Sequence, residues 1–259
     1  MLAADRLSVT RGGRAVVDAV SFDAAGGAVI GIVGPNGAGK STLVQALLGL
    51  VPSQGDILLD GKALAQWSRA EIARRVAYLP QGQSLHWPLS VERLVELGRL
   101  PHLAPLSRVS AADRAAVARA MATADVTGLA GRTATELSGG ERARVLLARA
   151  LAVEAPALIV DEPLASLDPA HQIAVMEILQ AEAARGVLVI AVLHDLGLAA
   201  RYCARVLVMD RGRLVADGAP DAVLTPDRLR ETYGIRAWFG AAGRVPIIVP
   251  IARDQPRRD

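Results

Sequence analysis

The chain has few aromatic residues, a single cysteine and no long apolar stretch. Phenylalanine, tryptophan and tyrosine together make up 3% of the 259 residues, so the core must be built from aliphatic side chains. The lone Cys203 cannot form an internal disulfide, which favours a reducing compartment. The longest apolar run covers residues 187–193, far short of the roughly 18 residues that a membrane-spanning helix needs. We therefore expect a chain that is not integral to a membrane.

Neither end of the chain carries a pattern typical of export or of nucleic-acid binding. The first residues lack the charged and then apolar pattern of a signal peptide, so we expect a cytoplasmic protein. The net charge is +3, to which a short basic tail at residues 252–259 contributes. Because this tail has neither interleaved aromatic residues nor a readout motif, we interpret it as a solvated segment and expect no nucleic-acid partner.

Lysine is also scarce, and one of the two lysines stands in a glycine-rich motif. Lys40 and Lys62 are the only lysines among the 29 lysines and arginines. Lys40 belongs to a segment of the form G-x-x-x-x-G-K-[ST], the phosphate-binding P-loop. The segment consists of Gly34, Pro35, Asn36, Gly37, Ala38, Gly39, Lys40, Ser41 and Thr42. An apolar run at residues 28–33 precedes it, and a stretch without helix breakers at 42–48 follows it.

This order of strand, glycine loop and helix predicts a nucleotide site that uses Mg²⁺. Glycines allow backbone N–H groups to converge on an anion, and the N-terminus of the following helix adds partial positive charge. Lys40 would contact the β- and γ-phosphates, and the Ser41 hydroxyl would ligate Mg²⁺. The alternative is a glycine-rich turn before an ordinary helix, which does not explain why the motif and its flanks agree.

The remaining pattern predicts an α/β fold with a mostly parallel sheet, an N-terminal pair of antiparallel strands and an inserted helical subdomain. Helices alternate with strands outside the insertion, which implies parallel pairing. Strands are expected at residues 7–10, 15–22, 28–33, 55–60, 76–79, 157–161, 187–193 and 206–209, and helices at 69–74, 169–184 and 195–202. Inside the insertion, helices are expected at 90–100, 110–124 and 139–153. The predicted core covers about residues 1–84 and 155–240, and the helical subdomain about 85–154.

Two carboxylates and a histidine follow predicted buried strands. Asp161 and Glu162 stand at the end of one apolar run, and ligands of open α/β sheets gather at such strand ends. Asp161 suits a Mg²⁺ site, whereas Glu162 faces the other way and could orient a water on the γ-phosphate. His194 ends the next strand, where a γ-phosphate contact would be needed. The alternatives are an Asp-Glu pair at the start of a helix, which Pro163 makes weak, and a purely structural histidine.

A second anion site is predicted where Leu137-Ser138-Gly139-Gly140-Glu141 opens a helix. Ser138 is a good N-cap, and the glycines expose backbone N–H groups. Because the P-loop already holds phosphate, this site is surplus within one molecule unless it completes the site of another. A plain capped helix is the alternative.

Together these motifs resemble the ATP-binding cassette ATPases. Six motifs occur in that family's order and approximate spacing: the P-loop, Gln81, residues 137–141, residues 160–163, residues 166–168 and His194-Asp195. The resemblance covers about residues 5–235 and implies one cassette, spanning residues 1–259, that binds and hydrolyses ATP.

The resemblance also implies a role for each motif. The P-loop residues bind ATP, and Ser41, Gln81 and Asp161 belong to the Mg²⁺ site. Gln81 links the γ-phosphate site to the helical region, Glu162 polarises the attacking water, and His194 contacts the γ-phosphate. Two copies are implied to pair head to tail, so that each supplies the other's ATP site with Ser138, Gly139, Gly140 and, at the dimer seam, Asp168.

Two residues depart from the family pattern. The family often has an aromatic residue on the first strand that stacks on adenine, and here Arg11 stands at that position. A guanidinium can stack on a base, but Arg11 could equally be a solvated turn residue. Glu141 replaces the usual glutamine, and the sequence reveals no consequence of that exchange.

A finer resemblance narrows the class to the ATPase subunits of bacterial importers for iron-siderophores, haem and cobalamin. It rests on residues 91–103, especially Gly98-Arg99-Leu100-Pro101-His102, and on residues 194–200 and 224–226. It implies a peripheral subunit on the cytoplasmic face of the inner membrane, beneath two permease subunits. An extracytoplasmic substrate-binding protein is then an indirect partner. The cargo itself is not readable from the motor.

Alternatives to an importer motor are an exporter motor, a non-transport cassette ATPase and a nucleotide sensor without turnover. A non-transport ATPase would show a long coiled coil or a second cassette, whereas here one P-loop exists and only residues 82–136 separate Gln81 from Leu137. Glu162 argues against a sensor. The stretch Leu85-His86-Trp87-Pro88-Leu89 is the predicted permease contact, the alternative being that Trp87 packs inside the helical region.

Overall fold

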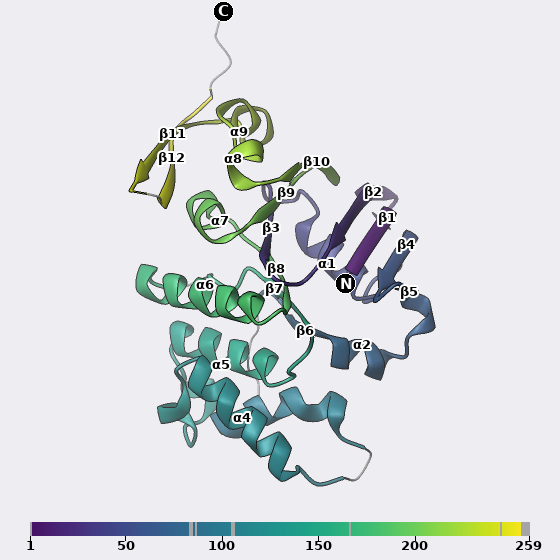
Figure 1. The fold of residues 1–259 in the computed structure, drawn as a ribbon, viewed down its shortest axis with the longest axis vertical. Helices are drawn as coiled ribbons and strands as arrows, with labels where there is room; N and C mark the ends of the chain where they lie inside the picture. Colours follow the sequence, from purple (N-terminus) through teal and green to yellow (C-terminus); the bar gives the residue numbers. More distant parts are fainter. Residues whose placement is uncertain are drawn as a thin grey trace, which may run out of the picture.

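A six-stranded sheet lies at the centre of the protein (Figure 1). In this computed structural model, residues 2–82, 85, 87–104, 107–165, 167–243 and 245–254 are described. The strand order is β10-β9-β3-β8-β7-β6, with bounds β3 Val29–Val33, β6 Val76–Leu79, β7 Ala157–Asp161, β8 Leu188–Val192, β9 Arg205–Asp210 and β10 Arg213–Gly218. All neighbours pair in parallel except β10 with β9. The predicted mostly parallel sheet is confirmed, and parallel pairing brings the carboxyl ends of β3, β6, β7 and β8 to one edge.

An antiparallel sheet formed mainly by the N-terminal strands lies beside the central one. Its order is β2-β1-β4-β5, with bounds β1 Leu2–Arg11, β2 Arg14–Ala24, β4 Gln54–Leu59 and β5 Lys62–Ala63. Alternate side chains such as Leu7 and Val9 are buried, as the two-residue period of a half-covered strand requires. The predicted antiparallel N-terminal pair is therefore confirmed.

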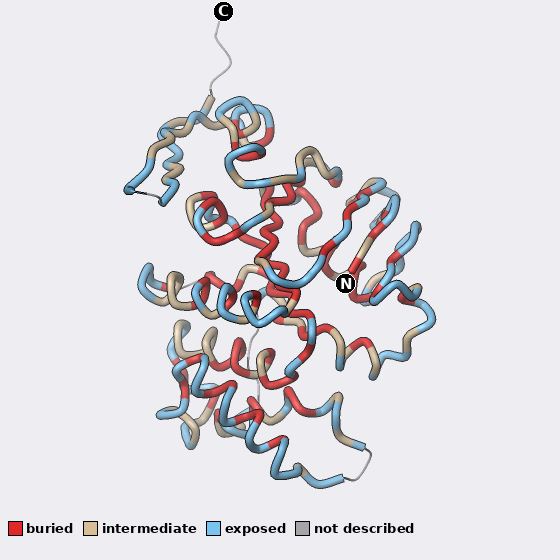
Figure 2. Tube along the Cα trace, in the orientation of Figure 1, coloured by how far each residue is buried: buried red, intermediate tan, exposed pale blue. Residues whose placement is uncertain are grey.

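The two faces of the central sheet are covered by different elements. Val29 and Val33 of β3 point into one apolar cluster, which they share with α6 (Pro169–Ala184), α7 (Leu196–Tyr202) and the helical region. Ile30 and Ile32 point into the other cluster, with α1 (Lys40–Leu47) and the antiparallel sheet. Figure 2 shows the buried strands running through the middle of the molecule between these layers. The continuous apolar runs of the sequence are thus strands covered on both faces.

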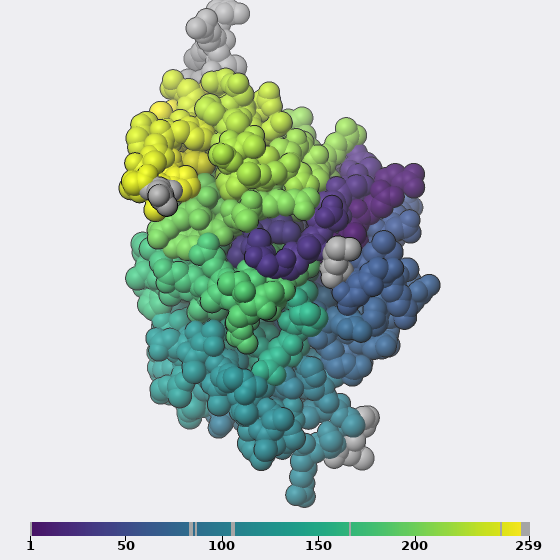
Figure 3. Space-filling view, in the orientation of Figure 1, coloured from purple at the N-terminus to yellow at the C-terminus, as the bar shows by residue number. Residues whose placement is uncertain are grey.

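A region built from helices forms one end of the molecule, coloured teal in Figure 3. They are α3 (Val91–Glu96), α4 (Ala111–Thr123) and α5 (Gly139–Leu151), with short 3₁₀ segments η2 (Leu97–His102), η3 (Thr127–Leu129) and η4 (Ala134–Glu136). Ser90, Ser110 and Ser138 each cap a helix of this region with their side chains. The helix predicted over 90–100 divides into α3 and η2. Outside this region, η1 (Leu64–Gln66) precedes α2 (Arg69–Arg75), which Ser68 caps.

The C-terminal part of the chain differs from the prediction. After β10 come α8 (Pro220–Val223), α9 (Pro226–Tyr233) and a hairpin of β11 (Ile235–Ala242) and β12 (Val245–Arg253). Residues 252–253, predicted to begin a solvated tail, instead complete β12, where Ala252 pairs with Arg236. The prolines of β12 are tolerated because a two-stranded ribbon leaves backbone N–H positions unpaired. Residues 255–259 lie outside the described residues.

Within the described part of the chain, none of the helices combines the length and the apolar character needed to cross a membrane.

Candidate functional site

The P-loop connects the carboxyl end of β3 to the first turn of α1, as the motif predicts. Gly39 caps α1 in the left-handed conformation, with a φ of +96°. A Cβ at Gly34 or Gly39 would collide with the backbone carbonyl of Met209 or Val16, so both positions require glycine. The first N–H groups of α1 lack partners within the helix, and residues 39–42 line a cavity, so this end of α1 is suited to bind an anion.

Lys40 is held under this loop by backbone carbonyls. Its side chain is largely enclosed, and the residue is 6% exposed. The Nζ donates hydrogen bonds to the carbonyls of Gly34 at 2.8 Å and Pro35 at 3.1 Å. Burial lowers the pKa of Lys40, and the carboxylates of Glu162 and Asp161 partly oppose that shift. A buried cation beside an anion-binding loop is suited to contact phosphate.

Ser41 and Asp161 place two oxygen atoms side by side. The Ser41 hydroxyl donates to Oδ1 of Asp161 at 3.1 Å, and Asp161 is 2% exposed at the end of β7. Burial raises the pKa of Asp161, while the hydrogen bond from Ser41 lowers it. Carboxylate and hydroxyl oxygens are ligands that Mg²⁺ accepts together with substrate phosphates, so the pair fits a Mg²⁺ site.

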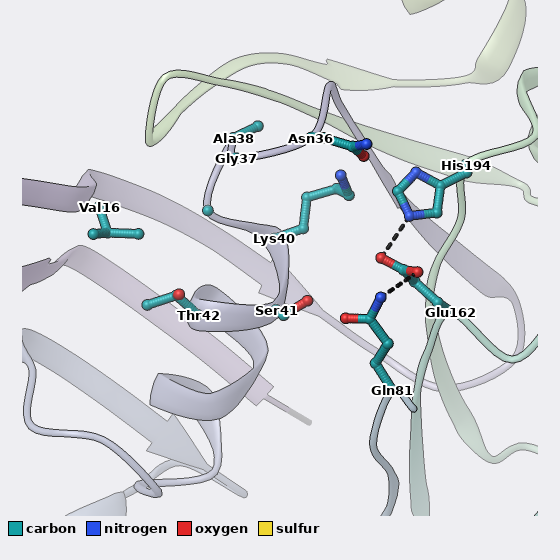
Figure 4. A pocket seen from close by; sticks show the side chains of 11 residues that line it. Val16, Asn36, Gly37, Ala38, Lys40, Ser41, Thr42, Gln81, Glu162 and His194 are labelled. Carbon is teal, nitrogen blue, oxygen red and sulfur yellow. Dashed lines mark hydrogen bonds and ion pairs between the residues drawn. The ribbon is translucent and has the colours of Figure 1, made fainter. Parts of the chain in front are cut away.

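Glu162 lies between two side chains from neighbouring strand ends (Figure 4). Gln81, which follows β6, donates from Nε2 to Oε2 of Glu162 at 2.6 Å. His194, which follows β8, has Nε2 2.5 Å from Oε1 of the same carboxylate. The φ of Glu162 is +52°, an uncommon value outside glycine that clusters at functional sites. The carboxylate is therefore held on both oxygens next to the P-loop.

These residues enclose a cavity of about 490 Å³, which is within the range of small-molecule sites. Its lining comprises Val16, Asn36, Gly37, Ala38, Gly39, Lys40, Ser41, Thr42, Gln81, Glu162 and His194. Sequence reasoning identified all of these residues except Val16. Val16 lies on β2, a strand that carries no nucleotide motif, so no signal in the sequence could have identified it.

Other predicted site residues lie away from this lining. Arg11 ends β1, and its Nη2 donates to Oε1 of Gln45 on α1 at 2.8 Å. Ser138 and Gly139 are exposed at the N-terminus of α5, and Gly140 follows them. Asp168 caps α6, accepting a hydrogen bond from His171 N at 3.0 Å. Ser166 lies outside the described residues.

Glu141 has a structural role that the sequence did not reveal. Its carboxylate accepts from Ser138 N at 2.9 Å while Ser138 caps the helix, and Arg132 donates to it at 2.7 Å. This capping box fixes the first turn of α5. The N–H groups of that turn are thereby presented in a defined orientation.

Comparison with known proteins identifies the family. A family model described as ABC transporter matches residues 17–165. The chain belongs to the ABC transporter family. It binds nucleotide and is an ATP hydrolase, as predicted.

Relatives of this ABC ATPase include import proteins. The chain is 50% identical to the hemin import ATP-binding protein HmuV of Nocardia farcinica, over 85% of this chain and 76% of the relative. The HmuV of Pseudomonas fluorescens strain Pf-5 is 46% identical, over 91% and 93%. The cobalamin import ATP-binding protein BtuD of Halobacterium salinarum is 44% identical, over 93% of this chain and 61% of the relative.

Solved structures agree with the fold. A transporter described as metal-chelate type, in an inward-facing conformation, has a TM-score of 0.83 at 25% identity and covers 96% of this chain and 97% of its own. The dimeric cassette MJ0796 has a TM-score of 0.75 at 22% identity, over 85% of this chain and 99% of its own, and shows the fold alone.

Proposed function

We propose that this ABC ATPase is the motor subunit of a bacterial importer for haem or a related metal chelate, such as cobalamin or an iron-siderophore. The observation that carries the ATPase part of the proposal is the carboxylate of Glu162, which two side chains hold beside an intact P-loop. The names of the haemin and cobalamin import relatives support the direction and class of transport. None of the relatives named above is described as an exporter or as a non-transport ATPase.

The chemistry would be in-line attack of water on the γ-phosphate of ATP. The P-loop N–H groups and Lys40 would bind the phosphates, which they neutralise and position. Glu162 would polarise the attacking water, and His194 would contact the γ-phosphate. Ser41 and Asp161, with Gln81 near them, would hold Mg²⁺, which supplies charge neutralisation at the phosphates.

A head-to-tail dimer would complete each ATP site. Ser138, Gly139, Gly140 and Asp168 lie outside the P-loop cavity and at exposed or partly exposed helix starts. A second copy could therefore contact ATP through them. The cassette MJ0796, which has a similar fold, is described as dimeric, and the head-to-tail order is the proposal made here.

The trans arrangement can be tested by mixing two inactive variants, Lys40→Ala and Ser138→Arg. A mixed dimer with sites between chains contains one site with both defects and one intact site, so ATPase activity should reappear. Sites within one chain would give no recovery in any mixture. A requirement for two sound sites would also prevent rescue, so specific activity should be measured against protein concentration as well. Failed rescue together with flat specific activity down to dilute monomer would contradict the trans site.

The chain would lie at the cytoplasmic face of the membrane, bound to two permease subunits. An extracytoplasmic substrate-binding protein would be an indirect partner, acting through those permease subunits. Trp87 is 75% exposed, which contradicts its packing inside the helical region and suits an interface. His86 of the same stretch lies outside the described residues. Stacking of Arg11 on adenine stays a proposal, and it would require the guanidinium to leave Gln45.

Transport can be tested by reconstituting the chain with the permease encoded beside its gene. Vesicles should take up haem in an ATP-dependent way, and Glu162→Gln should abolish uptake while leaving assembly intact. Equal uptake with the wild type and the variant would contradict the role of Glu162. Efflux without uptake would favour an exporter.

A further inference from the structure

The motif Gly98-Arg99-Leu100-Pro101-His102 has no place in the ATP site, yet one of its side chains is almost fully buried. Arg99 is 8% exposed. Its Nη1 donates to the carbonyls of Ala152 at 2.8 Å and Val153 at 3.3 Å, at the C-terminal end of α5. Helix carbonyls at this end lack partners within the helix and carry partial negative charge. Arg99 therefore caps α5 from a separate segment.

Two neighbours of Arg99 bring the same segment against the same helix end. A Cβ at Gly98 would collide with the carbonyl of Arg149, so η2 approaches α5 more closely than any other residue would allow. His102 has its Nε2 2.8 Å from the carbonyl of Val153. Gly98, Arg99 and His102 thus join η2 to α5 at three points along one short stretch.

Arg99 also joins α4 to this junction. Its Nε donates to Oδ1 of Asp113 at 2.9 Å. Asp113 in turn forms the capping box of α4 with Ser110. The planar guanidinium can bond to Asp113 of α4 and to the end of α5 at the same time, because its donors form a rigid fork that a lysine ammonium lacks.

The other side of η2 faces outward. Leu100 is 58% exposed and Leu97 is also exposed, whereas Gly98 and Arg99 between them are buried. The segment therefore presents apolar side chains on one side and binds the end of α5 on the other. The opposite end of α5 carries Ser138, and its 13 residues span about 20 Å at 1.5 Å per residue.

We propose that Arg99 is a positioning residue that fixes the C-terminal end of α5 to η2, so that movement of a docked permease reaches Ser138 at the other end of the helix. This inference rests on the proposed function, in which a permease contacts the helical region and Ser138 serves the partner's ATP. Arg99 touches neither ATP nor the reacting atoms. It acts by making η2, α4 and α5 move as one body.

The experiment compares Arg99→Lys and Gly98→Ala with the wild type in the complete transporter. Arg99→Lys keeps the charge but loses the fork, and Gly98→Ala separates η2 from α5 without changing any charge. Arg119→Met is the matched control. Arg99 and Arg119 both pair with Glu154, at 3.4 Å and 2.7 Å, but Arg119 is exposed and, within the described part of the chain, does not bond to the carbonyls of Ala152 or Val153. Each variant is tested for ATP affinity, for co-purification with the permease, and for ATPase activity with and without the permease.

Both test variants should bind ATP and co-purify with the permease like the wild type. Their ATPase activity without the permease should remain within about twofold, while stimulation by the permease falls at least fivefold, the lower end of typical coupling between sites of about 5- to 150-fold. Arg119→Met should be stimulated like the wild type. Normal stimulation in both test variants would refute the inference, as would an equal loss with and without the permease, since that is what a merely structural role predicts. If the permease does not stimulate the ATPase activity of the wild type, the proposed function is refuted, and the inference with it.

Discussion

Replacing Glu162 with glutamine separates ATP binding from hydrolysis more cleanly than other changes at the site. The carboxylate accepts from Gln81 at 2.6 Å and lies 2.5 Å from Nε2 of His194. A glutamine side chain can keep both contacts, since its oxygen can accept from Gln81 and its amide can donate to a neutral His194. The shape of the site is preserved, and what disappears is a negative charge and a base.

The loss of a general base typically slows a reaction by about 10²–10⁴-fold, which corresponds to about 2.7–5.4 kcal/mol in the barrier. Binding should not weaken, because removing a carboxylate near the γ-phosphate removes repulsion. We therefore expect unchanged or tighter ATP affinity by equilibrium titration, and a loss of that size in steady-state phosphate release. Glu231→Gln, which alters an exposed partner of Arg228, should leave both values unchanged. Hydrolysis by Glu162→Gln within twofold of the wild type would refute the assignment.

Four further results are expected. Lys40→Ala should cost about 2–5 kcal/mol of ATP affinity, measured by titration, because a charged partner of the phosphates is removed. Asp161→Asn should raise the Mg²⁺ concentration for half-maximal ATPase activity by about 10–100-fold, and an unchanged Mg²⁺ titration would contradict its role. Trp87→Ala should weaken co-purification with the permease by about 2 kcal/mol or more without changing ATP affinity. Hydrogen bonds from Ser110 and then Arg99 lower the pKa of Asp113 to about 2, so its stabilisation is present above about pH 4 and is lost as the pH falls toward 2. Urea unfolding of the wild type and Asp113→Asn should therefore converge over that range.

Elements with strong local signals were predicted well. The bounds of β6, β7 and α6 agree with the residues expected from the sequence, because buried strands read as continuous apolar runs and Asp168 with the following proline marks the start of α6. The convergence of Gln81, Glu162 and His194 was also predictable, since each follows a parallel strand and such strand ends share one edge.

The remainder depends on contacts between distant residues. The hairpin of β11 and β12 was missed because prolines interrupt its apolar pattern, whereas in the structure β12 packs against α7 and β11 against α9. The role of Arg99 is equally nonlocal, since the carbonyls that it binds lie more than 50 residues away. The bond from Arg11 to Gln45 joins two elements whose sequences carry no sign of each other.

The polar side chains of the site are hydrogen-bonded to other groups of the protein, so ATP has to replace these bonds when it binds. Lys40 is bonded to loop carbonyls, Ser41 to Asp161, and Gln81 to Glu162. Bound ATP and Mg²⁺ would exchange these internal partners for ligand oxygens rather than add contacts to free groups. Gln81 follows β6, so its release from Glu162 would break the hydrogen bond that joins the proposed catalytic carboxylate to the segment after β6. Binding of ATP and Mg²⁺ would therefore change the hydrogen bond between Gln81 and Glu162, which lie together beside the P-loop.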